Sequence, residues 1–268
     1  MYLVLMCVLC ALGFAALIVA ASGIPAWWLL PLFLLGFVLA HAVYVLVVWL
    51  FARRTDRSRP IEKQDPLCRA ATAAACRALC FYGGLRIHLS GLDKLPPENF
   101  LLVSNHRSLF DPLLFIGSMA EYNIAFVSKP SNLAIPLIGD VVYAAGFLAI
   151  DRENNRKALS TILQAADYLK RGVCSMAIYP EGTRSREGKL LPFHAGSFKI
   201  AQRAGVPLVI ACVRGTEQVK HRLPFRRTDV YFDVLETIPA EQVKALSTNE
   251  LSHYSRELME KVTGSSGA

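Results

Sequence analysis

Residues 100–112 read FLLVSNHRSLFDP, and this stretch decides the fold because it predicts a strand followed at once by a helix. The apolar run 100–103 is typical of a short buried strand. Asp111 and Pro112 predict the start of a helix, with the aspartate as its N-cap and the proline at the first helical position. His106 is then expected at the carboxyl end of the strand, with the Asp111 carboxylate one turn away.

The spacing of His106 and Asp111 suggests acid–base chemistry. A carboxylate beside an imidazole fixes its tautomer and stabilises its protonated form, so His106 could remove a proton from a hydroxyl group. Each residue alone has a simpler interpretation, because an aspartate at this place is commonly only a helix cap and a single histidine is commonly structural. The catalytic interpretation therefore depends on a second motif further along the chain.

The second motif is YPEGTRS at residues 179–185, which directly follows the short apolar run 175–178. With the first motif, and in this order, it resembles the 1-acyl-sn-glycerol-3-phosphate acyltransferase family of the glycerolipid acyltransferases. Four blocks of that family can be matched, at residues 105–111, 146–152, 181–185 and 206–210. The resemblance covers about residues 85–215. The chain departs from the family at Ala149, where an aromatic residue or proline is usual, and at His194, where a lysine is frequent.

The resemblance implies transfer of a fatty acyl group from a thioester to the free sn-2 hydroxyl of lysophosphatidic acid, which gives phosphatidic acid for phospholipid biosynthesis. In this scheme His106 is the general base and Asp111 orients it. The donor is an acyl-acyl-carrier-protein or an acyl-CoA, and neither a cofactor nor a metal is expected. Because the chain has no Gly-x-Ser-x-Gly motif, no covalent acyl-enzyme is expected either.

Two arginines are candidates for holding the phosphate of the acceptor. Arg152 and Arg184 each follow an apolar run, so both are expected at strand ends, where α/β sheets bind ligands. A guanidinium can hold a phosphate through two hydrogen bonds. The residues alone equally allow an ion pair of Arg152 with Asp151 or Glu153, and an exposed turn for Arg184. The resemblance assigns both arginines to the phosphate.

Four further residues complete the candidate substrate-binding site. Gly182 lets the backbone approach a ligand, and Thr183 adds a hydroxyl. Lys129 follows an apolar run and is a further candidate phosphate ligand. Glu181 would repel a phosphate, so we expect it to orient Arg184 or a backbone amide.

The first 52 residues predict a membrane hairpin. They contain no Lys, Arg, Asp or Glu and include two apolar runs, 2–22 and 27–52. Each exceeds the about 20 residues that a helix needs to span the hydrocarbon core of a bilayer. Two helices can both cross, or together dip into one leaflet. The basic cluster at 53–63 places this end of the hairpin, and the catalytic domain, on the cytoplasmic face of the cell membrane.

The charge of the chain lies entirely outside the hairpin. All 29 Lys and Arg and all 21 Asp and Glu follow residue 52, so the remainder carries the whole net charge of +8. A basic domain tethered to a lipid bilayer suits anionic lipid and anionic substrates. No zinc-finger spacing, aromatic RNA-binding run or long Lys/Arg tract supports nucleic acid as a partner.

The rest of the sequence alternates between strand and helix patterns, which predicts an α/β fold: a glycerolipid-acyltransferase-like domain with a mixed, largely parallel central sheet. Strands are expected at 85–89, 99–104, 123–128, 146–151, 174–179, 206–213 and 229–236, and helices at 61–81, 111–120, 154–171, 194–204 and 241–262. The expected units are the hairpin at 1–52, a basic amphipathic linker helix within 53–84, the acyltransferase domain at 85–262 and a flexible tail at 263–268.

Two alternatives to lysophosphatidic acid acylation stay open at this stage. A related acyltransferase could use another acceptor, such as glycerol 3-phosphate or a lyso-aminolipid. A membrane-tethered lipid-binding scaffold without activity is the other alternative, although such a scaffold has no need of both His106 and Asp111.

Overall fold

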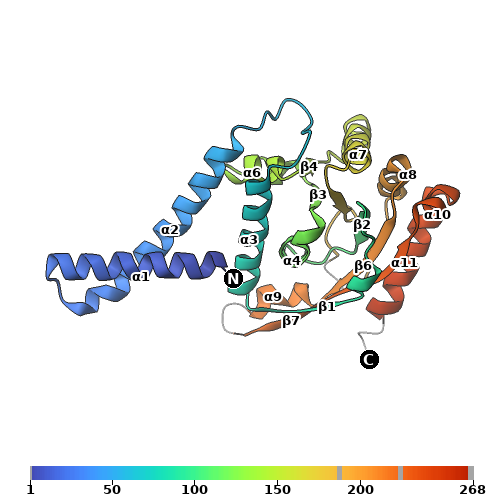
Figure 1. Ribbon diagram of the computed structural model, residues 1–268. Helices are drawn as coiled ribbons and strands as arrows, with labels where there is room; N and C mark the ends of the chain where they lie inside the picture. Colours follow the sequence, from blue (N-terminus) through green and yellow to red (C-terminus); the bar gives the residue numbers. More distant parts are fainter. Residues whose placement is uncertain (1, 186–188, 223–225, 265–268) are drawn as a thin grey trace.

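A seven-stranded sheet forms the centre of the protein in the computed structural model, which describes residues 2–185, 189–222 and 226–264 (Figure 1). The strand order is β1-β7-β6-β2-β5-β3-β4. β6 and β7 are antiparallel and the other neighbours are parallel, so the mixed, largely parallel sheet expected from the sequence is confirmed. The strands are β1 (Leu85–Ser90), β2 (Leu101–Ser104), β3 (Ile124–Ser128), β4 (Leu148–Ala149), β5 (Ser175–Ile178), β6 (Leu208–Arg214) and β7 (Thr228–Ile238).

Helices cover both faces of this sheet, which is why its central strands are continuously apolar. The helices α3 (Pro66–Tyr82) and α4 (Phe110–Ser118) lie on one face (Figure 1). The helices α7 (Asn155–Lys170), α8 (Lys199–Ala204) and α11 (Thr248–Gly264) lie on the other. Shorter helices are α5 (Pro130–Leu133), α6 (Ile138–Ala144), α9 (Val219–Arg222) and α10 (Ala240–Ala245).

Side-chain caps explain two differences from the predicted helices. The linker helix begins at Pro66 rather than at residue 61, because the Asp65 carboxylate caps it by accepting a 2.8 Å hydrogen bond from the Cys68 amide. The helix predicted over 241–262 is interrupted after α10. Ser247 then starts α11 through a reciprocal capping box with Glu250.

Two other segments also differ from the prediction. The strand expected over 146–151 shortens to the two residues of β4, at the edge of the sheet. The segment between β3 and β4, for which no element was predicted, contains α5 and α6. In addition, α11 continues to Gly264, into the segment 263–268 for which a flexible tail was expected, and residues 265–268 lie outside the described part of the chain.

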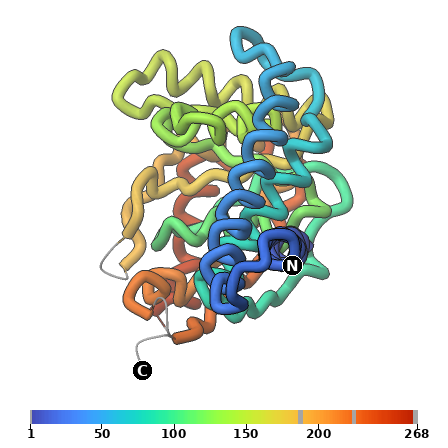
Figure 2. Tube along the Cα trace, turned by 90° about the vertical axis from the view of Figure 1, so that its left-hand side faces the viewer, coloured from blue at the N-terminus to red at the C-terminus, as the bar shows by residue number. Residues whose placement is uncertain are grey.

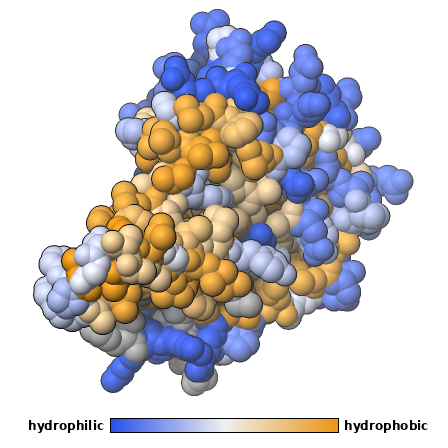
Figure 3. Space-filling view, turned by 60° about the vertical axis from the view of Figure 1, so that its left-hand side comes forward, coloured by the Kyte–Doolittle hydropathy of each residue, from blue (hydrophilic) through white to orange (hydrophobic). Residues whose placement is uncertain are grey.

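The N-terminal hairpin consists of α1 (Tyr2–Ser22) and α2 (Leu29–Ala52), and it projects from the α/β domain (Figures 1 and 2). Both helices are long and apolar enough to cross a membrane, yet only 22% and 11% of their most apolar windows are buried. A core helix of a soluble protein would be mostly buried, so the exposed apolar surface of the hairpin indicates membrane association. Figure 3 shows apolar side chains gathered over this projection.

The base of the hairpin packs closely on the domain. Leu3 and Cys7 of α1 form a small buried cluster with Ala78 of α3. Within the hairpin, Gly36 of α2 approaches α1 so closely that a Cβ there would lie 3.2 Å from the Cα of Ala11. Small residues at such crossings are typical of helices packed within a membrane.

One carboxylate ties the end of the hairpin to α6. Asp140 accepts a 2.9 Å hydrogen bond from the Trp49 indole and a 2.8 Å hydrogen bond from the Arg57 guanidinium. Arg57 also donates to the Leu133 carbonyl at 2.9 Å. Burial acts to raise the pKa of Asp140, but the hydrogen bonds from Arg57 and Trp49 outweigh it and hold this pKa below its ordinary value of 3.8.

We predict that Asp140→Asn lowers the free energy of unfolding at pH 7 by about 1 kcal/mol, the range of a partly exposed charged hydrogen bond. Because the folded-state pKa is depressed, this contribution is present above about pH 4 and is lost as the pH falls through the folded-state value. Thermal unfolding in detergent at pH 7 and pH 3 measures the difference. Asp167→Asn, which breaks an exposed helix-surface pair with Arg171, is the control. If Asp140→Asn were less stable than the wild type by the same amount at pH 7 and at pH 3, this account would be contradicted.

Candidate active site

The site lies where the five mutually parallel strands end. His106 follows β2, Lys129 follows β3, Arg152 follows β4, Glu181 follows β5 and Thr216 follows β6. Carboxyl ends of parallel strands share one edge of a sheet, so residues far apart in the sequence meet there. This topology places both sequence motifs on one side of the domain.

The imidazole and the carboxylate of the first motif are in direct contact. His106 Nδ1 lies 2.8 Å from Asp111 Oδ2, and the Asp111 side chain is completely buried. The same oxygen accepts hydrogen bonds from the Arg107 and Ser108 amides, at 2.6 and 2.8 Å, and the other oxygen accepts one from the Thr216 hydroxyl. Four donors from two segments, residues 106–108 and Thr216, therefore fix this carboxylate.

The prediction that Asp111 is a helix N-cap is wrong. Leu109 occupies that position with a helical backbone conformation, and Asp111 is the second residue of α4. A turn over residues 108–111, with the Asp111 amide 3.4 Å from the Ser108 carbonyl, leads into α4, which begins at Phe110, one residue before the aspartate. Its carboxylate therefore accepts from amides of the preceding turn and from the imidazole.

This arrangement determines which nitrogen of His106 is free. An ionised carboxylate can only accept, so Nδ1 carries the hydrogen in the contact with Asp111. Nε2 then bears the lone pair, as a general base needs. His106 also lines the main groove of the domain.

Tyr179, the residue before Pro180 and Glu181, stacks on the catalytic candidate. Its ring lies 4.1 Å from the His106 ring, centroid to centroid, at an interplanar angle of 6°. Burial, with the negative charge of Asp111 as a smaller cause, raises the pKa of Tyr179 well above its ordinary value, so the ring stays a neutral phenol. An electron-rich face in this position stabilises a protonated imidazole. The sequence interpretation missed this contact, although the tyrosine directly precedes the second motif.

Glu181 joins the two motifs through the backbone. Its Oε1 accepts a 2.7 Å hydrogen bond from the His106 amide, and its Oε2 accepts a 2.9 Å hydrogen bond from the Leu191 amide. Burial raises the pKa of Glu181, while these two amides oppose the shift. Of the two partners expected from the sequence, Arg184 or a backbone amide, the carboxylate binds backbone amides, and within the described residues it forms no hydrogen bond or ion pair with Arg184.

Asn105 also fixes the end of β2, and the sequence interpretation assigned it no role. Its side chain is completely buried and forms two hydrogen bonds with the backbone of Val213 in β6. Nδ2 donates to the Val213 carbonyl at 2.9 Å, and the Val213 amide donates to Oδ1 at 2.8 Å. These bonds extend the β2–β6 pairing by one residue and set the position from which His106 projects.

A groove of about 530 Å³ opens beside His106, a size within the usual range for small-molecule sites. Its walls are mainly apolar and come from α2, α3, α4 and α6. The membrane helix itself contributes Tyr44, Val45 and Val48. The groove therefore suits a hydrocarbon chain, with the imidazole at its polar end.

The cationic candidates gather at this polar end. Lys129, Arg152, Gly182, Thr183 and Arg184 all line the groove with His106. Partial desolvation lowers the pKa of Arg152, although its side chain keeps substantial exposure. Within the described part of the chain, neither of the ion pairs considered for Arg152 is formed, and Asp151 instead pairs with Lys157 at 3.7 Å.

Gly182 makes the close approach around these cations possible. Its φ of +74° favours glycine, and a Cβ there would lie 3.0 Å from the His194 ring and 3.5 Å from the Arg152 guanidinium carbon. His194 thus lies beside the arginine, at the position where the family frequently has a lysine. A side chain at residue 182 would crowd the His194 ring and fill the space beside Arg152.

We predict that Glu181→Gln destabilises the protein by about 1–3 kcal/mol. A glutamine offers one acceptor oxygen, so the amide of either His106 or Leu191 loses its buried partner. Thermal unfolding measures the loss, and acyl transfer should fall with it because the His106 backbone is released. Glu121→Gln, at an exposed position, is the matched control. Unchanged stability in Glu181→Gln would show that the two amides find other partners.

The chain is similar to known acyltransferases. The model of the acyltransferase family matches residues 86–214. The 1-acyl-sn-glycerol-3-phosphate acyltransferase of Escherichia coli (strain K12) is 32% identical over 163 residues, which cover 61% of this chain and 66% of that protein. The Haemophilus influenzae protein of the same name is 29% identical over 179 residues, covering 66% of this chain and 74% of the relative.

A solved structure supports the fold. The crystal structure of the 1-acyl-sn-glycerophosphate acyltransferase PlsC from Thermotoga maritima aligns with a TM-score of 0.61 and 24% identity, covering 85% of this chain and 92% of that chain. The fold and the family model define an acyltransferase domain. Residues 86–214 therefore belong to the acyltransferase family, and the chain is similar to proteins named 1-acyl-sn-glycerol-3-phosphate acyltransferase. The match to the Escherichia coli relative spans slightly less than two thirds of that protein.

Proposed function

We propose that the protein transfers a fatty acyl group from an acyl thioester to the sn-2 hydroxyl of lysophosphatidic acid, which forms phosphatidic acid. The observation that carries this proposal is the contact between His106 and a buried Asp111 at the end of an apolar groove. Cations line the same end of that groove, where the acceptor phosphate would lie. The names of the similar proteins support the same acceptor and product.

In the proposed reaction, His106 Nε2 takes the proton of the acceptor hydroxyl as its oxygen attacks the thioester carbonyl. The tetrahedral intermediate then collapses, the carbon–sulfur bond breaks, and the imidazolium gives its proton to the departing sulfur, so that a free thiol leaves and His106 is neutral again. A positioned base contributes about 10²–10⁴-fold, and holding both substrates in one groove contributes further. Atoms and protons balance without a covalent acyl-enzyme.

Two neighbours support His106 in this step. Asp111 holds Nδ1 and stabilises the imidazolium that forms, as a fully buried carboxylate can. The Tyr179 ring, stacked parallel at 4.1 Å, adds an attractive face for the same cation. Both interactions strengthen when the imidazole gains its proton, which is when stabilisation increases the rate.

Arg152 and Arg184 bind the phosphate of the acceptor in this proposal, with Lys129 as a third cation and Thr183 as a hydroxyl donor. A planar guanidinium suits phosphate through paired hydrogen bonds. Glu181 holds the His106 backbone instead of contacting the substrate, and Gly182 keeps the space beside Arg152 open.

The donor and the membrane side are also proposals. The donor is an acyl-acyl-carrier-protein or an acyl-CoA, and both present an anionic carrier to a basic domain. The domain works at the cytoplasmic face of the cell membrane, because positive residues follow α2 directly, at 53–63. The same orientation keeps both the lipid acceptor and the thioester within reach.

We predict that His106→Ala lowers transfer at least about 10²-fold and leaves the fold intact, because the base is lost from a partly exposed position. The measurement is phosphatidic acid formation by detergent-purified protein offered carrier-protein and CoA thioesters. His88→Ala is the matched control, because His88 is an exposed histidine of β1 that pairs with Asp229 of β7. Substantial transfer by a folded His106→Ala protein would overturn the mechanism. Acylation of glycerol 3-phosphate in preference to the lysolipid would assign another acceptor.

We predict that Arg184→Ala mainly raises KM for the phosphorylated acceptor, by roughly tenfold or more, since it removes a charge-assisted contact present before and during the reaction. Arg184→Lys should recover part of the affinity. Arg171→Ala, which removes an arginine that directly follows α7 and does not line the groove, is the control. A collapsed kcat with unchanged KM would instead place Arg184 on the transition state.

A further inference from the structure

Two neighbouring leucines are exposed on α7. Leu159 and Leu163 keep 50% and 45% of their surface exposed, and their spacing of four residues puts them on adjacent turns of one helix face. Arg156 lies three residues before this pair and Lys170 seven residues after it, so the same face carries an exposed cation at each end. An apolar centre within a charged rim is the usual composition of a surface that binds another protein.

The helix α8 adds two cations beside this face. It packs against α7 on the same side of the sheet (Figure 1). Lys199 and Arg203 are one turn apart on α8 and both are exposed, whereas Ile200 and Ala201 between them are fully buried. We call the two leucines and the four cations together the α7–α8 patch: Arg156, Leu159, Leu163, Lys170, Lys199 and Arg203.

The charge of the α7–α8 patch is available to a partner. Among the residues that the structure describes, none of its four cations forms an ion pair within the protein. Glu153 is exposed just before α7, and Asp167 on α7 pairs with Arg171 at 2.7 Å. The positive charges exceed these two acidic groups, so the surface attracts an acidic partner.

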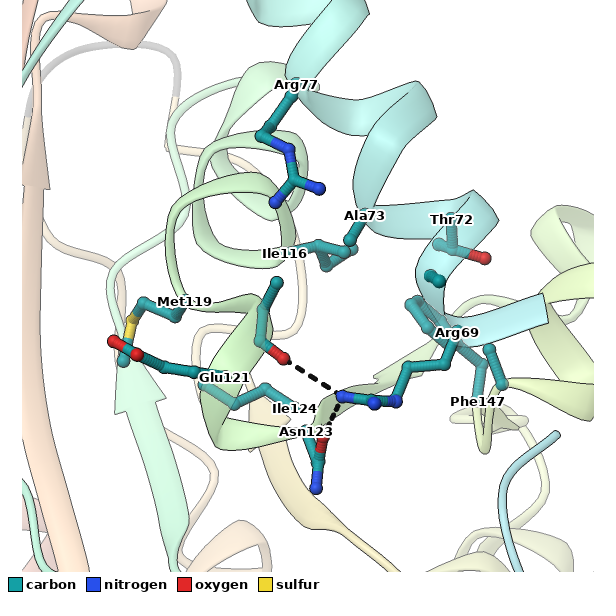
Figure 4. Close-up of a pocket in the computed structure, with 13 residues that line it drawn as sticks. Arg69, Thr72, Ala73, Arg77, Ile116, Met119, Glu121, Asn123, Ile124 and Phe147 are labelled. Atoms are coloured by element: carbon teal, nitrogen blue, oxygen red, sulfur yellow. Dashed lines mark hydrogen bonds between the residues drawn. The ribbon is translucent and has the colours of Figure 1, made fainter. Parts of the chain in front are cut away.

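The arginines of the pocket between α3 and α4 are, by contrast, engaged within the fold. Arg69 donates to the Ala120 carbonyl at 3.2 Å and to the Asn123 side chain (Figure 4). Arg77 donates to the Gly117 carbonyl at 3.1 Å. These bonds hold the end of α4 against α3, so this second basic cluster serves the fold, whereas the cations of the α7–α8 patch do not.

The α7–α8 patch also lies away from the membrane hairpin. The hairpin packs on α3, where Leu3 and Cys7 form a buried cluster with Ala78. The helices α7 and α8 cover the opposite face of the sheet from α3 (Figure 1). Contact with lipid through the hairpin therefore does not account for the exposed leucines of α7, which suit a partner that approaches from water.

One end of the α7–α8 patch adjoins the polar end of the groove. Arg152 lines that end, and α7 begins three residues later, at Asn155. Leu163 lies about 12 Å further along the helix axis, at about 1.5 Å per residue. A protein bound along α7 and α8 would therefore lie next to the opening beside which His106 is placed.

We propose that the α7–α8 patch is the docking surface for an acidic acyl carrier protein, which delivers the acyl thioester to His106. The four cations face carboxylates of the carrier, and Leu159 and Leu163 pack against apolar side chains at the centre of the contact. The flexible arm of the carrier then extends into the groove. This inference rests on the proposed function and narrows its donor, because a CoA thioester can be held through its phosphates and gives the two leucines no role.

The test compares two donors that carry the same acyl chain, one on acyl carrier protein and one on CoA, with lysophosphatidic acid as acceptor and the full-length protein in detergent. We expect Leu159→Ser combined with Leu163→Ser to lower kcat/KM for the carrier-protein thioester by roughly tenfold or more, since the apolar centre of the contact is lost. The value for the CoA thioester should stay within about twofold of the wild type, because the chemistry beside His106 is unchanged.

Charge reversal on α8 tests the rim separately. We expect Arg203→Glu to lower kcat/KM for the carrier-protein thioester by about fivefold, mainly through slower association, and high salt should reduce this difference. The matched controls are Arg86→Glu and Leu89→Ser, two exposed positions on β1 at the far edge of the sheet. Both should behave as the wild type with either donor. Thermal unfolding checks that each variant is folded.

Four results would overturn the inference alone. They are unchanged carrier-protein kinetics in the folded patch variants, an equal loss with both donors, a wild type that uses only the CoA thioester, and a change of oligomeric state in the leucine variant with carrier transfer intact. The last would assign the α7–α8 patch to a second copy of the chain. A wild type that forms no phosphatidic acid from either donor would overturn the proposed function and this inference with it.

Discussion

The site depends on one buried carboxylate. Asp111 has no exposed surface, and an uncompensated charge in that position would be costly, so the surrounding chain must supply donors. It supplies four: the His106 ring, two amides of the turn before α4, and the Thr216 hydroxyl after β6. The same contacts that keep the charge tolerable also hold the β2–α4 turn against the end of β6.

Neighbouring contacts extend this arrangement across the sheet. Asn105 joins β2 to β6, and Glu181 joins the segment after β5 to the His106 amide. Tyr179 then covers one face of the imidazole. His106 is thus held at the edge of its ring by Asp111 of α4, and at its backbone and on one ring face by Glu181 and Tyr179, which both follow β5. This leaves the ring little freedom to reorient before substrate arrives.

Local patterns were sufficient for some of these features and not for others. The buried strand before His106, the five-residue spacing to Asp111 and the exposed apolar hairpin all follow from short-range composition, and the resemblance to a known family was confirmed. Thr216 is 105 residues from Asp111, and no local signal predicts that contact, because it arises from strand order. The segment with α5 and α6 was missed since these helices have 4 and 7 residues, too short for a periodic pattern to show. The N-cap interpretation of Asp111 failed because α4 begins one residue before it. Its carboxylate accepts hydrogen bonds from amides of the preceding turn, and not from amides further along the helix.

The membrane helix α2 contributes Tyr44, Val45 and Val48 to the wall of the groove. The groove is therefore built partly from a helix whose exposed apolar surface indicates membrane association. Under the proposed function, a lysolipid would pass sideways from the membrane into this groove with its hydrocarbon tail kept away from water. The concentration that governs encounter is then the mole fraction of acceptor in the surrounding lipid, a two-dimensional quantity, and not its molarity in solution. For such an enzyme, dilution of the acceptor with inert phospholipid slows turnover even when the total amount in the sample is unchanged.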